Sequence, residues 1–540
     1  MLADYPILSL ITFSPLLGVL LLLMMPKHQG QWIKTIGIAT TFIPLALTIW
    51  LYVDYNYKLF GPQYGEFHSW IQIPFNTEAL QSVNSLILKF DYNLAVDGLS
   101  LPLVFLTALI GAMAALASVN IKKRWKSYFI WFLLLETGMF GVFIAQDLFL
   151  FFVFFELTII PMFFLIGIWG YFNREKAAIK FLIYNGVGSA LMLVAFLILI
   201  ATAGFSVVEG TETFDIYFSG NLDAIMNNLF VNAESYVNNT SVENPFYLGE
   251  SAKWIVFSLL LVAFGIKLPI FPFHTWMLKV HQEAPPSVVM IHSGILLKMG
   301  GYGLIRFGIL LFPAQAQEWA WVLALLGVIN IIYGAVLAFV QNDFKLVLAY
   351  SSISHMGVVL LGIASFNQIG LEGAVFQLVS HGLISALLFL LVGSIYERTQ
   401  TTMLDELGGL AKSTPFISGI LLVAGMASLG LPGLSGFISE FLAFLGLFET
   451  MKTVTIIGAL GIILAAVYVL RGVLNITFGP MKEAYTGIRD ARLIEAIPMI
   501  VLVAFILLLG IYPSVLSQSF HQTLGEFEQF IQNYDAGIGR

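Results

Sequence analysis

Long apolar runs, separated by short polar segments, follow one another along almost the whole chain. A helix needs about 20 apolar residues to cross a bilayer. The pattern predicts fourteen such helices, near residues 5–26, 32–53, 95–120, 127–145, 148–170, 177–204, 252–277, 284–311, 317–340, 343–366, 370–396, 413–448, 453–479 and 492–512. The twelfth run is long enough for two half-helices. We therefore expect an all-α polytopic membrane protein.

The basic residues divide unevenly between the two sides of this arrangement. Of 25 Lys and Arg residues, sixteen fall in segments on one side, five on the other and four within spans. Cytoplasmic loops carry an excess of Lys and Arg. We therefore expect both termini on the outer side, together with the longer polar segments 54–92 and 205–251 as partly ordered caps. Residues 5–26 lack a basic leader and a small-residue cleavage site, so we expect a retained first span.

Composition supports the membrane class and excludes several kinds of chemistry. Hydrophobic residues make up 59% of the 540 residues and charged residues only 11%, whereas soluble proteins carry about 25% charged residues. With no cysteine, the chain can hold no disulfide, thiolate zinc site or cysteine-bound iron–sulfur cluster. No nucleotide-binding loop, catalytic triad or basic cluster for nucleic acid is present. We expect no cofactor in this chain.

Two Leu-Pro pairs interrupt apolar runs, Leu268-Pro269 in the seventh and Leu431-Pro432 in the twelfth. Proline breaks a helix, and a bilayer tolerates such a break only where it faces protein or a water-filled cavity. Because five predicted spans separate the two runs, they cross the membrane in opposite directions, as in inverted repeats. Proline is also common in ordinary membrane helices. We predict two inverted five-helix repeats with broken helices 7 and 12, in the layout 1–126, 127–311 (first repeat), 312–480 (second repeat) and 481–540 (helix 14 and tail).

Four ionisable residues lie deep within apolar runs: Glu156, Lys267, Lys298 and Glu440. Charges inside a membrane are costly, and by default they indicate a functional site. A buried lysine gives up its proton more readily than an exposed one, and a nearby carboxylate opposes this release. We interpret the four as candidate proton carriers. The alternatives are a static ion pair between Glu156 and Lys267, and a Lys298 side chain that reaches an interface.

Three histidines within predicted spans, His292, His355 and His381, are possible relay groups, because imidazole exchanges protons near neutral pH. The alternative is that each is a buried hydrogen-bonding group. His274 and His281 lie on either side of the polar turn after the seventh span. Their spacing matches no common metal motif, so we predict no metal site there.

Three further charged residues have less specific interpretations. Asp97 is expected to cap the start of the third span. Arg306 is expected to anchor the end of the eighth span. Arg471 is either structural or a modifier of the second half of the channel.

Several motifs together resemble one family, the antiporter-like membrane subunits of respiratory complex I and the related Mrp-type sodium/proton antiporters. Within it the chain looks most like the M-type subunit, chain 4. It ends about 28 residues after the last predicted span, too short for the long lateral helix of L-type subunits. The motifs are VDGLS (96–100), DLFLFFVFFE (147–156), GIKLPIFPFHTW (265–276), EAPPSVVMIHSGILLKMGGYGLIR (283–306), DFKLVLAYSSISHMG (343–357), VFQLVSHGL (375–383) and GLPGLSGFISEF (430–441).

The resemblance implies roles for particular residues. Glu156 would pair with Lys267, Lys298 would lie on a central hydrophilic axis, and Glu440 would connect that axis outward. His355 and His381 match polar positions along the same axis.

The resemblance also implies the setting in which the chain acts. It would translocate protons in a complex I-like NAD(P)H:quinone oxidoreductase of the bacterial plasma membrane, assembled with other membrane-arm subunits. Iron–sulfur clusters, flavin and quinone would belong to partner subunits. The alternatives are a subunit of an Mrp-type antiporter and a structural spacer.

Two positions depart from the family pattern. Lys279 stands where many relatives have an acid. His292 stands where an apolar residue is expected, and could be an extra relay point or a sign of a subfamily with a different electron-input arm.

Overall fold

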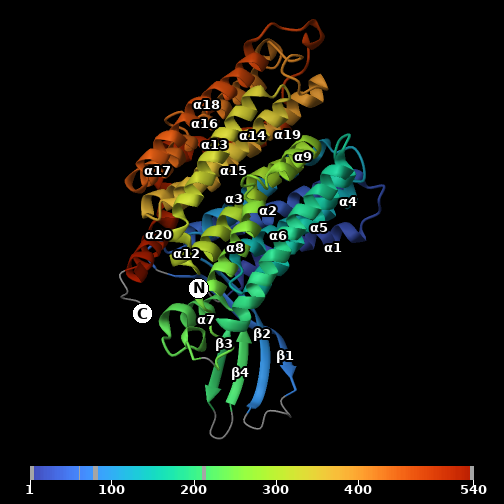
Figure 1. Cartoon of the computed structure of the whole chain (residues 1–540). Helices are drawn as coiled ribbons and strands as arrows, with labels where there is room; N and C mark the ends of the chain where they lie inside the picture. Colours follow the sequence, from blue (N-terminus) through green and yellow to red (C-terminus); the bar gives the residue numbers. More distant parts are fainter. Residues whose placement is uncertain (1–4, 60, 77–82, 210–213, 242, 536–540) are drawn as a thin grey trace.

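The computed structural model describes residues 5–59, 61–76, 83–209, 214–241 and 243–535. Most of them form a bundle of long helices, with a small β-sheet projecting from one end (Figure 1). The first described helix, α1, begins and the last, α20, ends toward the end of the bundle that carries the sheet. Within the described residues, twelve helices are long and apolar enough to cross a membrane. The chain is thus a multi-pass membrane protein, as expected.

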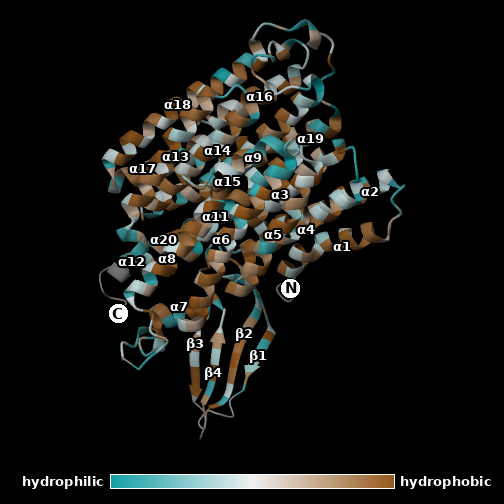
Figure 2. Cartoon of the chain, turned by 45° about the vertical axis from the view of Figure 1, so that its right-hand side comes forward, coloured by the Kyte–Doolittle hydropathy of each residue, from teal (hydrophilic) through white to brown (hydrophobic). Residues whose placement is uncertain are grey.

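The spanning helices follow the predicted apolar runs closely. They are α1 (Ile7–Met24), α2 (Gly30–Asp54), α3 (Leu101–Ala117), α4 (Trp125–Ile144), α5 (Leu148–Trp169), α6 (Arg174–Thr202), the continuous segment Pro286–Ile309, α13 (Ala320–Val340), α14 (Phe344–Ala364), α15 (Gln368–Thr399), α18 (Lys452–Phe478) and α19 (Leu493–Ile511). Shorter or amphipathic helices are α7 (Leu222–Met226), α12 (Pro313–Glu318) and α20 (Ser514–Asp535). Hydrophobic residues cover these helices, and hydrophilic ones gather in the loops (Figure 2).

The two remaining predicted spans are broken, as the prolines indicated. The seventh is divided into α8 (Glu250–Lys267) and α9 (Thr275–Glu283). The twelfth is divided into α16 (Pro415–Ser428) and α17 (Ser435–Thr450). At the first break, Asn330 of α13 satisfies freed backbone groups: its Oδ1 accepts from the Phe271 amide at 2.8 Å and its Nδ2 donates to the Pro269 carbonyl.

The expectation of an all-α chain is wrong outside the bundle. The two polar segments predicted as caps form one four-stranded sheet, in the order β1-β2-β4-β3. β2 pairs with β4 in parallel, and the other two pairings are antiparallel. Parallel strands far apart in sequence leave no local hairpin signal. The strands are β1 (Gln63–Phe75), β2 (Val83–Val96), β3 (Phe205–Glu209) and β4 (Phe214–Ser219).

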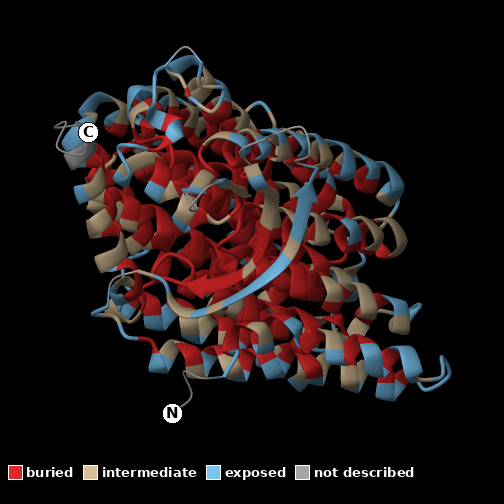
Figure 3. Cartoon of the chain, turned by 90° about the horizontal axis from the view of Figure 1, so that it is seen from below, coloured by how far each residue is buried: buried red, intermediate tan, exposed pale blue. Residues whose placement is uncertain are grey.

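Two segments run through the centre of the bundle, Pro286–Ile309 and α15, and the apolar window in each is fully buried. Seen from the end that carries the sheet, buried residues fill the middle and exposed ones lie at the periphery (Figure 3). Packing at the centre is close: a Cβ on Gly300 would lie 2.5 Å from the Leu268 amide nitrogen. The centre therefore brings the first break directly against the segment that carries Lys298.

Candidate functional site

Lys298 lies in the central segment, two residues after a π-helical stretch at His292–Leu296. Its side chain is fully buried, so it does not reach an interface. The ammonium donates to the Ser293 carbonyl at 2.6 Å and lies 2.7 Å from Nδ1 of His381 on α15. Lys298 and a ring nitrogen are thus in direct hydrogen-bond contact inside the bundle.

Two further groups continue from His381. The ring of His355, on α14, has its centroid 5.2 Å from that of His381. Its Nε2 lies 3.0 Å from the carbonyl of Ser428, the last residue of α16, and 3.4 Å from Oε1 of Glu440 on α17. Both half-helices of the second break therefore contact the same imidazole. Lys298, His381, His355 and Glu440 form a continuous buried series, which we call the central axis.

Two small cavities adjoin this axis. Both are lined by His355 and His381, and one also by Gln377 and Glu440. Each leaves about 10 Å³ for the centre of a water molecule, which is close to the least space that holds one water. A water in either cavity could carry a proton across the gap between the two rings.

The Lys267 site lies beside the first break, at the last residue of α8. Among the described residues its ammonium has no hydrogen-bond partner, and it lies 4.6 Å from the centroid of the Phe155 ring. The Oε1 atom of Glu156, on α5, is also buried without a partner. The two charges interact electrostatically, but no ion pair within 4.0 Å joins them. The implied direct pairing of Glu156 with Lys267 is therefore not made in this conformation.

His292 makes a contact that the sequence did not reveal. Its Nδ1 lies 2.9 Å from Nε2 of His281, a residue that we had placed only at the edge of the polar turn. Both side chains are fully buried. The two rings belong to different elements, α9 and the central segment, which are joined at Pro285-Pro286.

Glu136, in α4, is a second residue that the sequence analysis missed. Its side chain is fully buried, and among the described residues neither carboxyl oxygen has a hydrogen-bond partner. It packs against Gly111 of α3, where a Cβ would come within 2.6 Å of Oε1. A single Glu in the apolar run 127–145 was the available signal.

Arg306 lies near the end of the central segment, where an anchor was expected, and its buried guanidinium pairs with the Asp97 carboxylate. The other oxygen of Asp97 accepts from the Leu99 and Ser100 amides, immediately before α3 begins, which agrees with the expected cap. Burial opposes ionisation of Asp97, but the ion pair outweighs it and lowers the pKa of this carboxyl. This pair fixes the sheet end of the central segment to α3.

Arg471 and Lys279 lie outside the axis. The exposed Arg471 donates to the carbonyls of Phe339 and Gln341 at the end of α13, which is a structural role. Lys279 is exposed and approaches Gln282. Within the described part of the chain, neither residue makes a hydrogen bond or ion pair with the buried histidines or lysines.

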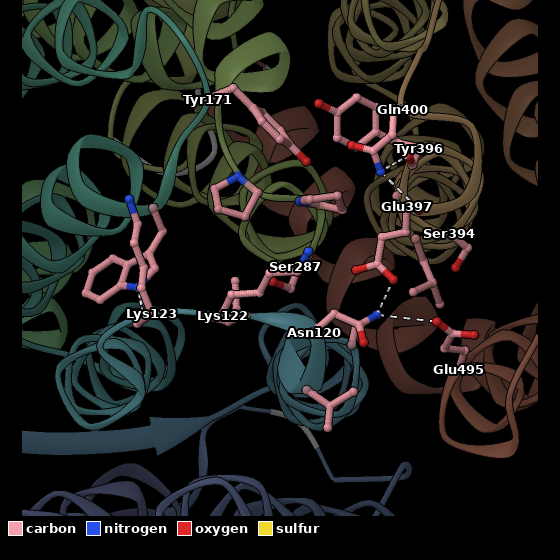
Figure 4. A pocket seen from close by; sticks show the side chains of 18 residues that line it. Asn120, Lys122, Lys123, Tyr171, Ser287, Ser394, Tyr396, Glu397, Gln400 and Glu495 are labelled. Carbon is pink, nitrogen blue, oxygen red and sulfur yellow. Dashed lines mark hydrogen bonds between the residues drawn. The ribbon is translucent and has the colours of Figure 1, made fainter. Parts of the chain in front are cut away.

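A pocket of about 310 Å³ is lined by the end of α3, which leads away from the sheet, and by the start of the central segment (Figure 4). On one side, Asn120 donates to Glu397 at 2.7 Å and to Glu495 at 3.3 Å. Ser287 of the central segment and Tyr171 also line it. The pocket thus brings solvent to the start of the segment that carries His292 and Lys298. Among the described residues no cluster of three His, Asp or Glu side chains could hold a metal ion.

Comparisons with known proteins identify the family and the fold of the chain. The family model described as "NADH:quinone oxidoreductase/Mrp antiporter, TM" matches residues 145–467. The chain is 38% identical to NAD(P)H-quinone oxidoreductase chain 4 1 of Synechococcus sp. (strain JA-2-3B'a(2-13)), covering 96% of this chain and 92% of that protein. It is 35% identical to NADH-quinone oxidoreductase subunit M of Rhodobacter capsulatus, covering 99% and 98%.

Solved structures show the same fold. A chain of respiratory complex I from Thermus thermophilus superposes with a TM-score of 0.80 at 28% identity, covering 97% of this chain and 99% of that one. A chain of the Mrp complex from Dietzia sp. DQ12-45-1b gives 0.75 at 21% identity, covering 97% and 99%, a likeness of fold alone. The resemblance inferred from the motifs is confirmed: the chain belongs to the family of antiporter-like membrane subunits of NADH:quinone oxidoreductases and Mrp antiporters.

Proposed function

We propose that the chain is the M-type (chain 4) proton-translocating subunit of a complex I-like NAD(P)H:quinone oxidoreductase. The names of the relatives that match nearly its full length support this assignment. The observation that carries it is the central axis, in which a buried lysine, two histidines and a carboxylate follow one another between the two broken helices. Ionisable groups inside a membrane indicate a functional site by default, and proton relays are among the functions that such groups serve.

The geometry supports a stepwise transfer along the axis. With Nδ1 of His381 unprotonated, a Lys298 ammonium would donate to it directly across the 2.7 Å contact, so this transfer would need no rearrangement. A proton on Nε2 of His355 faces the Ser428 carbonyl and, slightly farther away, the Glu440 carboxylate. Protonation of Glu440 removes the negative charge beside the imidazole, so the axis returns to its starting state only when Glu440 releases its proton outward.

The Lys267 site is the proposed loading side of the same path. Among the described residues its ammonium has no hydrogen bond to hold the proton, and the Glu156 carboxylate is the negative charge that favours its charged form. Moving or neutralising Glu156 would therefore switch Lys267 from holding a proton to releasing it. Partner subunits would supply this change when quinone is reduced. We place proton entry at the pocket at the start of the central segment.

We also propose that the chain has fourteen spans, ten of which form two inverted repeats. Counting each broken helix as one span gives fourteen spans, with repeats at 127–311 and 312–480 in inverted orientation. Supporting this layout, each half contains one helix interrupted at a Leu-Pro pair, with Lys267 at the first break and Glu440 beyond the second. Helices 1–3 (1–126) and helix 14 with the tail (481–540) would flank the repeats.

The assembly and location are also proposed. We infer a hetero-oligomer with other membrane-arm subunits in the bacterial plasma membrane, with both termini on the outer side. Iron–sulfur clusters, flavin and bound quinone would belong to the partners, and the lack of cysteine in this chain supports this division for the clusters.

Purification of the complex through a tag on this chain tests the assignment. We expect quinone-site and iron–sulfur subunits to co-purify, and NAD(P)H oxidation coupled to quinone reduction and proton pumping in reconstituted vesicles. A complex of small membrane subunits that lacks redox activity and exchanges sodium for protons would overturn the assignment in favour of an Mrp-type antiporter.

A further inference from the structure

We propose that His281 and His292 form a two-histidine relay that carries protons between the Lys267 site and the central axis. The inference rests on the proposed function and extends it to a residue, His281, that the motif comparison left without a role. The relay is made by a ring on α9 and a ring on the central segment, in direct contact at 2.9 Å.

The position of the pair links the two lysine sites. Phe181 of α6 lies close to both the Lys267 site and the histidine pair. Its ring centroid is 5.8 Å from the Lys267 ammonium and 6.1 Å from the centroid of the His292 ring. On the other side, the His281 ring lies 4.9 Å from that of Phe389, which also lines the cavity beside His355 and His381. The pair therefore stands between one aromatic ring at the Lys267 site and another at the central axis.

The nitrogen atoms have the arrangement that a relay requires. The inner atoms, His281 Nε2 and His292 Nδ1, share one hydrogen bond, so one of them carries the proton and the other accepts. The outer atoms, His281 Nδ1 and His292 Nε2, are buried and have no hydrogen-bond partner among the described residues. Buried polar atoms are almost always satisfied, so two open ring nitrogens at the ends of one pair indicate sites for proton exchange.

The transfer balances without any further reactant. A proton arrives at His292 Nε2, the proton on Nδ1 of the same ring passes to His281 Nε2, and the proton on His281 Nδ1 leaves. On each ring one N–H bond forms at one nitrogen and another breaks at the other nitrogen, so the pair stays neutral overall. Each passage leaves both rings in the other tautomer. Both rings must therefore rotate, so that the starting arrangement of N–H groups is restored, before a second proton passes in the same direction.

Amide substitutions separate a relay from a structural contact. In His292→Asn the amide occupies the position of Nδ1, and in His281→Gln it occupies that of Nε2, so both variants keep a hydrogen bond between the two residues. Neither amide accepts a proton at one atom while releasing one from another at neutral pH. The matched control is His68→Gln on exposed β1, and the reference for a broken path is Lys298→Ala.

The complex is assayed in proteoliposomes with NAD(P)H and quinone, after gel filtration has shown that each variant assembles. We expect His292→Asn and His281→Gln each to reduce proton pumping to the level of Lys298→Ala. The double variant should pump no worse than either single one, because a series path is broken only once. His68→Gln should pump as wild type does.

Other results overturn the relay. If the amide variants pump at the wild-type rate while Lys298→Ala does not, the pair is only a structural contact and the proposed function stands. If Lys298→Ala also pumps at the wild-type rate, the proposed function itself fails. Should one amide variant not assemble, the other still decides, because either substitution interrupts the same path.

Discussion

The close packing of the central segment against the first break yields a quantitative prediction for Gly300→Ala. A Cβ at this position would lie 2.5 Å from the Leu268 amide nitrogen, 2.8 Å from the Phe264 carbonyl oxygen and 2.9 Å from Cα of Leu268. Ordinary contacts need about 3.5–4.0 Å, so the segments must separate by about 1 Å. The opposing atoms are backbone, and no rotamer change relieves the clash.

The energetic effect follows from two opposing terms. Alanine gains about 1 kcal/mol over glycine in a helix, whereas overpacking costs about 1–3 kcal/mol, with the upper end expected against backbone. Gly186→Ala in α6 is the matched control, because nothing lies within 4 Å of its added Cβ. The difference in unfolding free energy between the two variants therefore isolates the overpacking cost, about 3 kcal/mol.

Thermal unfolding of the purified complex and proton pumping in vesicles are the assays. Gly300→Ala should lower the unfolding midpoint relative to Gly186→Ala. Because Lys267 adjoins Leu268, a displacement of about 1 Å should also reduce pumping, by up to roughly 10²-fold. Equal stability and equal pumping of the two variants would show that the close approach of these segments affects neither the stability of the complex nor its proton pumping.

Three further predictions concern the supports of the bundle. Arg306→Met leaves the buried Asp97 carboxylate unpaired and should cost about 3–5 kcal/mol, most of which should return when Asp97→Asn is added, as thermal unfolding would show. Burial raises the pKa of Asp147 from 3.8 to about 6, although hydrogen bonds from backbone amides oppose this shift. The protonated carboxyl therefore stabilises the fold below pH 3.8, and this stability is lost as the pH rises through 6. This loss, about 3 kcal/mol, should be absent in Asp147→Asn, and the infrared carboxylic acid band of the wild type should vanish over the same range. Asn330→Leu leaves the Phe271 amide without its acceptor and should cost about 1–3 kcal/mol in the same unfolding assay.

Much of the membrane architecture could be predicted from the sequence, because the bilayer imposes simple rules. Apolar runs of about 20 residues locate the spanning helices, and prolines marked both breaks, at Pro269 and Pro432. Buried charges are rare enough in membranes that Lys298 and Glu440 stood out individually. The structure places both on one axis together with His355 and His381.

The rest depends on contacts between segments distant in sequence. The parallel pairing of β2 with β4, more than 100 residues apart, left no local signal in the sequence. The antiparallel pairs β1–β2 and β3–β4 join consecutive strands, so their pairing was the part of the sheet open to prediction. His281 acquired a role only because its ring contacts that of His292. The separation of Glu156 from Lys267 depends on side-chain conformation, about which a motif gives no information.

The central claim is that this chain moves protons through its buried charged groups, and Lys267→Ala in the intact complex tests it most directly. Donor oxidation, quinone reduction and vesicle acidification are followed together, once assembly of the variant has been shown. The account predicts that acidification collapses and that quinone reduction falls with it, although the complex is assembled. Wild-type acidification and wild-type quinone reduction in that variant would contradict the account and leave the charged axis a structural feature.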